Sequence, residues 1–118
     1  MQLASIPPPV GPPIDASRLD EASGGDPEFV AEILDLYVGD AEMNLTNLLA
    51  AVGASKVDQI ISLSHVIKGS SANVGATTMQ ALANKMEAMA RVGDLSKMDG
   101  LAKRLIVELE RVRTYCRS

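Results

Sequence analysis

One histidine occurs in the sequence, His65, and Lys68 and Gly69 follow it three and four residues later. On a helix, residues at these spacings are neighbours on the same surface. A neutral imidazole is available as a nucleophile near physiological pH, and a lysine ammonium is a flexible point charge that can meet phosphate oxygens. A glycine beside them leaves room for another molecule to approach. These three residues therefore have the chemistry needed to accept a phosphoryl group and pass it to another protein.

Each of these residues also has an ordinary interpretation. A single surface histidine on a helix commonly has no function, and a surface lysine is commonly only a solvated charge. A glycine within a helix costs about 1 kcal/mol relative to alanine, but it can be an incidental defect. The apolar neighbours Ile61 and Val66 are compatible with scattered surface residues. The joint pattern favours a functional site over these separate explanations.

The segment that carries His65 is expected to be a helix from residue 55 to about residue 71. At about 100° per residue, one set of apolar and small side chains falls in a single sector, which we assign to the core side. His65 then points into solvent, with Ile61, Val66 and Ala72 near it. The core set comprises Ile60, Leu63, Ser64, Ile67 and Ser71.

Apolar residues recur every three or four positions in four substantial segments, at about residues 26–53, 55–71, 77–92 and 96–116. A short additional helix is expected at residues 15–22, where two glycines follow it. No segment alternates in the manner of a β-strand. The sequence therefore predicts an all-α fold, namely an antiparallel four-helix bundle with a short additional N-terminal helix.

Several polar residues are placed to begin these helices. Asp26 can cap the second helix, since a proline at the first helical position follows it. Ser55 with Asp58, and Ser96 with Asp99, have the spacing of a capping box. These pairs predict the starts of the third and fifth helices.

Length and composition limit the class of protein. The chain of 118 residues has the length of one small domain, and its net charge of -4 argues against nucleic acid as a partner. Neither a signal peptide nor an apolar run of about 20 residues is present, so we expect a cytoplasmic protein with no membrane contact. Residues 1–14 hold five of the six prolines and are expected to form a flexible tail or linker, with the bundle at residues 15–118.

Other chemistries fit the sequence less well. A hydrolase would need a nucleophile, a base and an orienting group, whereas His65 is followed by lysine and glycine and Cys116 stands near the far terminus. A metal bundle would need several histidines or a Glu-x-x-His pair, and Ser62 is the residue three before His65. We therefore expect no metal and no cofactor. The methionine-rich segment at residues 77–92 fits a core stripe better than a partner groove.

Residues 65–76 read His-Val-Ile-Lys-Gly-Ser-Ser-Ala-Asn-Val-Gly-Ala. This stretch resembles the motif of the histidine phosphotransfer domain of multistep two-component phosphorelays, most of all in bacterial members. The motif has histidine, two residues, Lys-Gly, small residues and a later glycine. The resemblance extends through the order of the helices over about residues 15–116. Val66 and Ile67 stand where many members have a polar residue and then leucine, a departure that leaves the chemistry intact.

The resemblance implies that His65 accepts a phosphoryl group from the aspartyl phosphate of a response-regulator receiver domain and returns it to another receiver, downstream of a hybrid histidine kinase. Lys68 would stabilise the phosphoryl group and Gly69 would allow the partner to approach. The chain would be a monomeric carrier and not an enzyme, with the metal-bearing acidic pocket on the receiver. Structural roles would fall to Ser70, Ser71 and Gly75, and the partner would dock on Ile61, Ser62, Val66, Ala72 and Asn73.

Two related interpretations remain open at this point. A helical adaptor that binds receivers without relaying would need the same bundle but not His65. A phosphotransfer domain of a chemotaxis-type kinase would have the same motif, but such domains normally continue into further kinase domains.

Overall fold

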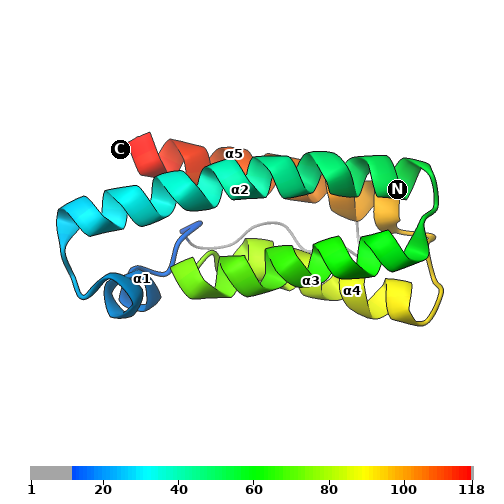
Figure 1. The fold of residues 1–118 in the computed structure, drawn as a ribbon, viewed down its shortest axis with the longest axis horizontal. Coiled ribbons are helices and arrows are strands. Elements are labelled where there is room, and N and C mark those ends of the chain that lie inside the picture. The colour runs from blue at the N-terminus through cyan, green and yellow to red at the C-terminus, as the bar shows by residue number, and fades with distance from the viewer. Residues whose placement is uncertain (1–11, 118) are drawn as a thin grey trace.

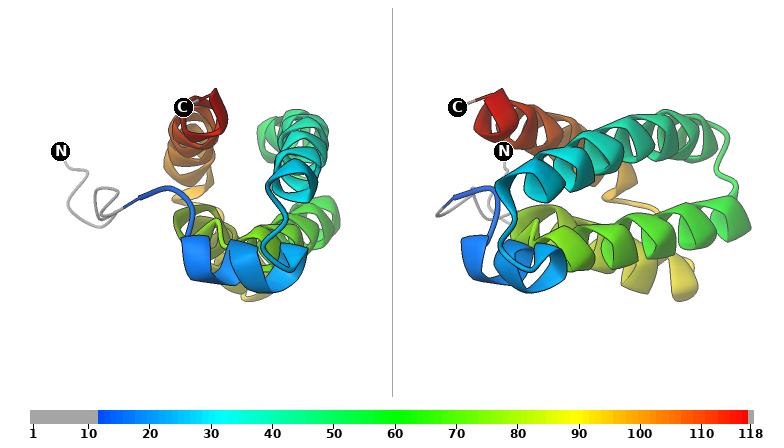
Figure 2. Two further views of the ribbon diagram at one scale, coloured as in Figure 1. Left: turned by 90° about the vertical axis from the view of Figure 1, so that its left-hand side faces the viewer. Right: turned by 60° about the vertical axis from the view of Figure 1, so that its left-hand side comes forward.

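A computed structural model describes residues 12–117 and consists of five helices, α1 (Ala16–Ser23), α2 (Pro27–Gly53), α3 (Val57–Val74), α4 (Thr77–Arg91) and α5 (Met98–Arg117). Successive long helices run in opposite directions (Figure 1). Seen end-on, α2 and α5 lie on one side of the bundle and α3 and α4 on the other, while α1 crosses one end (Figure 2). The predicted four-helix bundle with a short N-terminal helix is confirmed.

Aspartate caps begin the first two helices. The Asp15 carboxylate accepts a hydrogen bond from the backbone N–H of Ser17 at 3.0 Å, and the Asp26 carboxylate accepts one from Glu28 at the same distance. Each cap satisfies a backbone N–H that has no partner within the helix. The start predicted for the second helix at Asp26 is therefore confirmed, with Pro27 at its first position.

The two predicted capping boxes do not form. Helix α3 begins at Val57, two residues after Ser55, and no side chain caps it. Ser55 instead takes a left-handed conformation with φ of 53° in the tight reversal after α2, so it cannot occupy the cap position. Ser96 donates its hydroxyl hydrogen to Asp94 at 2.7 Å, which holds it in a turn before α5 starts. Local turn geometry thus overrides the capping-box spacing at both places.

The core is built from aliphatic side chains and methionine. Met79 and Met86 of α4 are fully buried and Met89 is partly buried, which confirms that the methionine-rich segment faces the core. Ile14 is also buried, at 1% exposure, so the packed part of the chain begins before residue 15. The remainder of the predicted tail, residues 1–11, lies outside the described residues.

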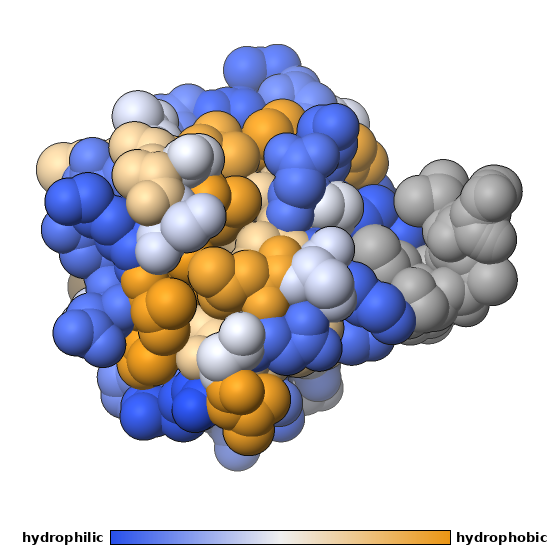
Figure 3. Space-filling view, turned by 90° about the vertical axis from the view of Figure 1, so that its right-hand side faces the viewer, coloured by the Kyte–Doolittle hydropathy of each residue, from blue (hydrophilic) through white to orange (hydrophobic). Residues whose placement is uncertain are grey.

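The end of the bundle where α2 leads into α3 and α4 leads into α5 carries apolar surface (Figure 3). A shallow groove of about 270 Å³ lies there, with Leu49, Val52 and Leu95 in its walls. Val92 in the neighbouring connection is 80% exposed. This end is far along α3 from the glycine that closes that helix.

Gly75 closes α3 in a left-handed conformation with φ of 76°. Its carbonyl oxygen accepts a hydrogen bond from the backbone N–H of Asp15 at 2.7 Å. A Cβ atom at Gly75 would stand 2.6 Å from the Asp15 carbonyl oxygen and 3.0 Å from the Arg18 Cβ. Glycine is therefore needed here both for the backbone angle and for the close approach of the segment before α1.

We expect Gly75→Ala to lower the free energy of unfolding by about 2–4 kcal/mol, because left-handed strain and overpacking act together. Gly24→Ala is the matched control, since Gly24 also ends a helix at φ of 69° but has open space where its Cβ would be. It should cost only about 1–2 kcal/mol. Urea denaturation of both variants measures the difference, and equal losses would mean that the contact with Asp15 is unimportant.

Candidate functional site

Helix α3 places His65 on its outer surface. The His65 side chain is 63% exposed, while its neighbours Ser64 and Ile67 are buried at 0% and 1%. The predicted orientation of this helix is therefore confirmed for His65 and for the core side. An imidazole at this position can be reached by a partner without any change in the fold.

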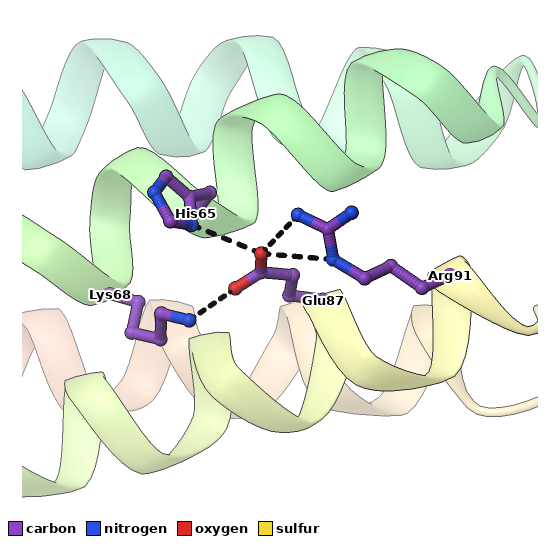
Figure 4. Close-up of polar contacts among 4 residues, drawn as sticks. All are labelled: His65, Lys68, Glu87 and Arg91. Carbon is purple, nitrogen blue, oxygen red and sulfur yellow. Dashed lines mark hydrogen bonds and ion pairs between the residues drawn. The ribbon is translucent and has the colours of Figure 1, made fainter.

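A carboxylate from the next helix holds the imidazole. Glu87 of α4 has a side chain only 6% exposed, and its Oε2 lies 3.0 Å from His65 Nδ1. The same carboxylate pairs with Lys68, whose Nζ is 2.6 Å from Oε1. Arg91, one turn further along α4, donates from Nη2 to Oε2 at 2.7 Å. Figure 4 shows His65, Lys68 and Arg91 converging on this single buried acid.

The two cations keep Glu87 ionised. Hydrogen bonds from Lys68 and then Arg91 lower the pKa of Glu87 to about 2, against the opposing effect of burial and with a further contribution from His65. A carboxylate can only accept hydrogen bonds, so His65 Nδ1 must carry the hydrogen. In the neutral ring the lone pair is then on Nε2. The site thus selects one tautomer and leaves the free lone pair on Nε2.

At low pH, the free energy of unfolding should depend on the pairing of ionised Glu87 with its neighbours. The carboxyl of Glu87 takes up a proton near pH 4.5 in the unfolded chain but only near pH 2 in the folded one. As the pH falls through this window the unfolded state binds more protons, so the stabilisation present above pH 4.5 is progressively lost. The Glu87→Gln variant has no carboxyl at this position to protonate, so its stability lacks this pH dependence.

We therefore expect the stability difference between the wild type and Glu87→Gln to shift in favour of the variant as the pH is lowered from about 5 to about 2. Denaturant titrations at closely spaced pH values measure both curves. Two curves that stay parallel over this range would show that the carboxylate is not held ionised by its neighbours.

Gly69 lies one turn beyond His65 on the exposed side of α3. A Cβ placed on it would meet no atom within 4 Å beyond its chain neighbours and the backbone of its own helix, so packing against the rest of the fold does not require a glycine there. The space that a larger side chain would occupy is solvent beside the imidazole. A glycine at this position therefore leaves open space in which another protein could approach His65.

The serines of the motif face the interior to different degrees. The Ser71 hydroxyl forms a buried hydrogen bond of 2.7 Å with the Tyr37 hydroxyl of α2, which joins two helices. Burial raises the pKa of Tyr37 to about 12, although the bond with Ser71 acts in the opposite direction. Ser70 is half-buried and donates to the Ile67 carbonyl of its own helix at 3.3 Å. Both serines are small residues at positions where α3 packs closely.

The predicted docking residues lie along the same helix. Val66 is 49% exposed, Ser62 and Asn73 are exposed, and Ile61 and Ala72 are half-buried. Val66, which adjoins His65, is a large apolar side chain held in solvent. An apolar side chain beside the imidazole is suited to contact with a protein partner.

Glu87 and Arg91 were not among the site residues predicted from the sequence. Glu87 stands four residues after Ala83 and three before Ala90, both of which are buried, so it occupies a core position of α4. A single acid within an apolar stripe needs charged partners, because an unpaired buried carboxylate is costly. The position of Glu87 within an apolar stripe could therefore have indicated a buried ion pair. The four-residue spacing of Glu87 and Arg91 identifies one of its partners.

Within residues 12–117, no three histidine, cysteine, aspartate or glutamate side chains come together as a metal site would require. Cys116 is a free thiol. None of the helices in this part of the chain is both long enough and apolar enough to cross a membrane.

Known phosphorelay proteins are similar in sequence to this chain. Residues 32–115 match the Hpt domain family. The phosphorelay intermediate protein rdeA of Dictyostelium discoideum is 33% identical over 98 residues, which is 83% of this chain and 39% of that protein. Multistep phosphorelay regulator 1 of Schizosaccharomyces pombe is 33% identical over 76 residues, or 64% of this chain and 25% of that protein. The chain thus spans less than half the length of these curated relatives.

Two solved structures share the fold. Histidine-containing phosphotransfer protein B of Pseudomonas aeruginosa superposes with a TM-score of 0.85 at 27% identity, covering 92% of this chain and 94% of that one. The HPT domain of a sensor hybrid histidine kinase from Shewanella gives a TM-score of 0.74 at 17% identity, covering 88% and 90%. At that identity the second match shows the fold alone.

Proposed function

This chain belongs to the Hpt domain family, and from that premise we propose that His65 is its phosphoacceptor, carrying a phosphoryl group between receiver domains of a phosphorelay. The observation that carries the proposal is the pairing of His65 Nδ1 with Glu87 Oε2, 3.0 Å apart, on a side chain that is 63% exposed. One ring nitrogen is held and the other faces solvent. The family predicted from the motif is confirmed by the match over residues 32–115.

During the proposed transfer step, the His65 ring keeps its proton. Nε2 of His65 attacks the phosphorus of an aspartyl phosphate, a P–N bond forms, and the P–O bond to the aspartyl carboxylate breaks. The ring keeps the hydrogen on Nδ1 and becomes positively charged. The Glu87 carboxylate accepts a hydrogen bond from that Nδ1–H and opposes the new charge at short range, in the way that a buried carboxylate stabilises an imidazolium. The reverse step returns the phosphoryl group to a second receiver.

Lys68 is proposed to stabilise the phosphoryl group. Its side chain is 29% exposed and its ammonium is held 2.6 Å from Glu87 Oε1, which keeps a positive charge on the same surface as His65. A charge-assisted contact with phosphate oxygens is a strong one for its size. The chain has no acidic cluster of its own in the described region, so we assign the metal-bearing pocket to the receiver.

The docking face proposed for the receiver surrounds His65. It consists of Ile61, Ser62, Val66, Ala72 and Asn73, with Ser70, Ser71 and Gly75 keeping the helix in place behind it. The exposed apolar Val66 beside the imidazole supports this choice. We further propose that the chain acts as a monomer in the cytoplasm and receives its phosphoryl group through a receiver supplied by a hybrid histidine kinase.

A transfer assay separates this function from that of a non-relaying adaptor. A receiver domain labelled with radioactive phosphate on its aspartate is mixed with the chain, and the label on each protein is followed with time. The proposal expects loss of label from the receiver and gain by the chain, in a linkage that is labile in acid and stable in base. Stable binding of the receiver without any gain of label would identify an adaptor instead.

Gly69 is expected to act through access alone. Gly69→Gln should slow transfer markedly, because the longer side chain projects into the space beside His65, whereas the fold has room for it. Gly69→Ala should be neutral or stabilise the helix by up to about 1 kcal/mol. Transfer rates and thermal unfolding are measured for both variants. An unchanged rate in Gly69→Gln with intact folding would make this glycine an incidental feature of the helix.

A further inference from the structure

The Glu87 carboxylate divides its two oxygens between different partners. The Lys68 ammonium lies 2.6 Å from Oε1, an atom that is shielded from solvent. The other oxygen, Oε2, accepts two hydrogen bonds from Arg91, from Nε at 3.2 Å and from Nη2 at 2.7 Å, and it lies 3.0 Å from His65 Nδ1. Figure 4 shows Lys68 and Arg91 reaching the carboxylate from different directions. Glu87 is therefore held by two cations that do not compete for one oxygen.

Lys68 has two partners in the proposed mechanism, and they lie in different places. In the resting site its ammonium is held at the buried carboxylate, whereas the proposed phosphoryl group is carried by the ring of His65, whose side chain is 63% exposed. The Lys68 side chain is 29% exposed and has a flexible stem, so it can turn outward to the phosphoryl group. That turn takes a positive charge away from Glu87, whose side chain is only 6% exposed.

Arg91 is placed to compensate Glu87 when Lys68 turns away. A buried carboxylate that loses its cation is strongly destabilised, because neither water nor an opposite charge then stabilises it. The two hydrogen bonds of Arg91 are on Oε2 and do not involve Lys68, and an arginine stays charged in proteins. Arg91 also lies one turn from Glu87 on the same helix, so this pair does not depend on side chains of α3.

From these contacts we propose that Arg91 is a positioning residue that retains Glu87 against His65 while Lys68 leaves to bind the phosphoryl group. The inference rests on the function proposed for His65, and it gives Arg91 no contact with the phosphoryl group. In the resting site, Glu87 pairs with both cations. In the phosphorylated site, Lys68 pairs with the phosphoryl oxygens and Arg91 stays with Glu87. Without Arg91, Lys68 would remain at Glu87 and the transfer step would lose its charge-assisted contact.

Transfer rates in single and double variants test this assignment. With Glu87 present, Arg91→Ala should slow transfer from a phosphorylated receiver roughly tenfold, the lower end of what one hydrogen bond to a charged group contributes. Lys68→Ala should slow it by a similar factor. The double variant should be little slower than either single variant, because both lose the same contact with the phosphoryl group. Arg91→Lys should recover most of the rate, since it restores a positive charge beside Glu87. Thermal unfolding should show that Arg91→Ala is folded, because Glu87 then keeps Lys68.

The most discriminating comparison places Arg91→Ala in the Glu87→Gln background. A neutral amide needs no cation, so Lys68 is free there and the loss of Arg91 should not slow transfer further. Arg113→Ala is the matched control in both backgrounds, since Arg113 pairs with Glu110 on α5 and is not part of the site. Equal slowing by Arg91→Ala in both backgrounds would show that Arg91 contacts the phosphoryl group or the receiver itself, which would overturn the proposal. A wild-type rate in Arg91→Ala would also overturn it.

A carboxyl titration tests the same assignment without a receiver. The Lys68→Ala variant represents the site after Lys68 has turned away, and carbon-13 NMR follows the Glu87 carboxyl as the pH is lowered. The pKa of Glu87 should stay below its ordinary value of 4.5 while Arg91 is present, and it should rise clearly when Arg91→Ala is added. An ordinary or raised pKa in Lys68→Ala alone would overturn the proposal. Failure of the wild type to take up label from a receiver would instead contradict the function proposed for His65.

Discussion

Replacement of Glu87 by alanine is expected to slow phosphoryl transfer to His65 by roughly 10- to 100-fold, the range known for losing the partner that orients a metal-binding histidine. The imidazole would lose the acceptor that lies 3.0 Å from Nδ1. Both tautomers would then be populated, and the positive charge formed on the ring would lack its nearby carboxylate. Lys68 and Arg91 would also be released, since Glu87 is the partner that holds both.

A graded series distinguishes orientation from charge. Glu87→Gln keeps an oxygen that can accept from Nδ1 but removes the charge, so its rate should lie between those of the wild type and Glu87→Ala. Glu110→Ala is the matched control, because it removes an exposed glutamate that pairs with Arg113 on α5. Its transfer rate should be unchanged. Rapid-quench transfer from one phosphorylated receiver measures all four proteins, and a wild-type rate in Glu87→Ala would remove Glu87 from the account.

The Glu87 variants are expected to remain folded. The Lys68 and Arg91 side chains are 29% and 57% exposed, so each can turn to solvent when the carboxylate is removed. Loss of a charge whose partners can reach water costs far less than stranding a buried ion. Far-UV circular dichroism should therefore show unchanged helix content in Glu87→Ala. Slowed transfer can then be attributed to the site.

The overall fold followed from periodic apolar residues because each helix buries one continuous stripe. In α3 this stripe also fixed the direction of His65, since the core-facing residues Ile60, Ser64 and Ile67 leave that position outside. Helix starts were less predictable where the connection is tight. Ser55 lies in a left-handed reversal, and the conformation of such a turn depends on how the two helices pack and not only on local residue types.

Glu87, the acid that completes the site, could not be predicted for a related reason. Glu87 lies 22 residues from His65 in the sequence, and no local rule connects them. Their contact depends on the rotation of α4 against α3, which is fixed by buried side chains such as Met79 and Met86. The motif around His65 predicts a nucleophile with a nearby cation, but the choice between its two ring nitrogens required the packed structure.

Replacement of His65 by glutamine is expected to abolish labelling of the chain completely, because the sequence contains no other histidine. The substitution removes the nucleophile and keeps an exposed polar side chain. The His65 side chain is 63% exposed and its one contact with a buried group is the hydrogen bond to Glu87, so the stability of the bundle should fall by no more than about 1 kcal/mol. Unfolding measured beside the labelling assay verifies that the variant is folded.

The most direct test of the central claim is to locate the phosphoryl group on the atom that carries it. Nitrogen-15 labelled protein is phosphorylated by a receiver and its phosphorus–nitrogen coupling is recorded by NMR. The account predicts one coupling, to Nε2 of His65, with Nδ1 still protonated and hydrogen-bonded to Glu87, and no signal from His65→Gln. A coupling to Nδ1, or a phosphoryl group that persists on the His65→Gln variant, would contradict it.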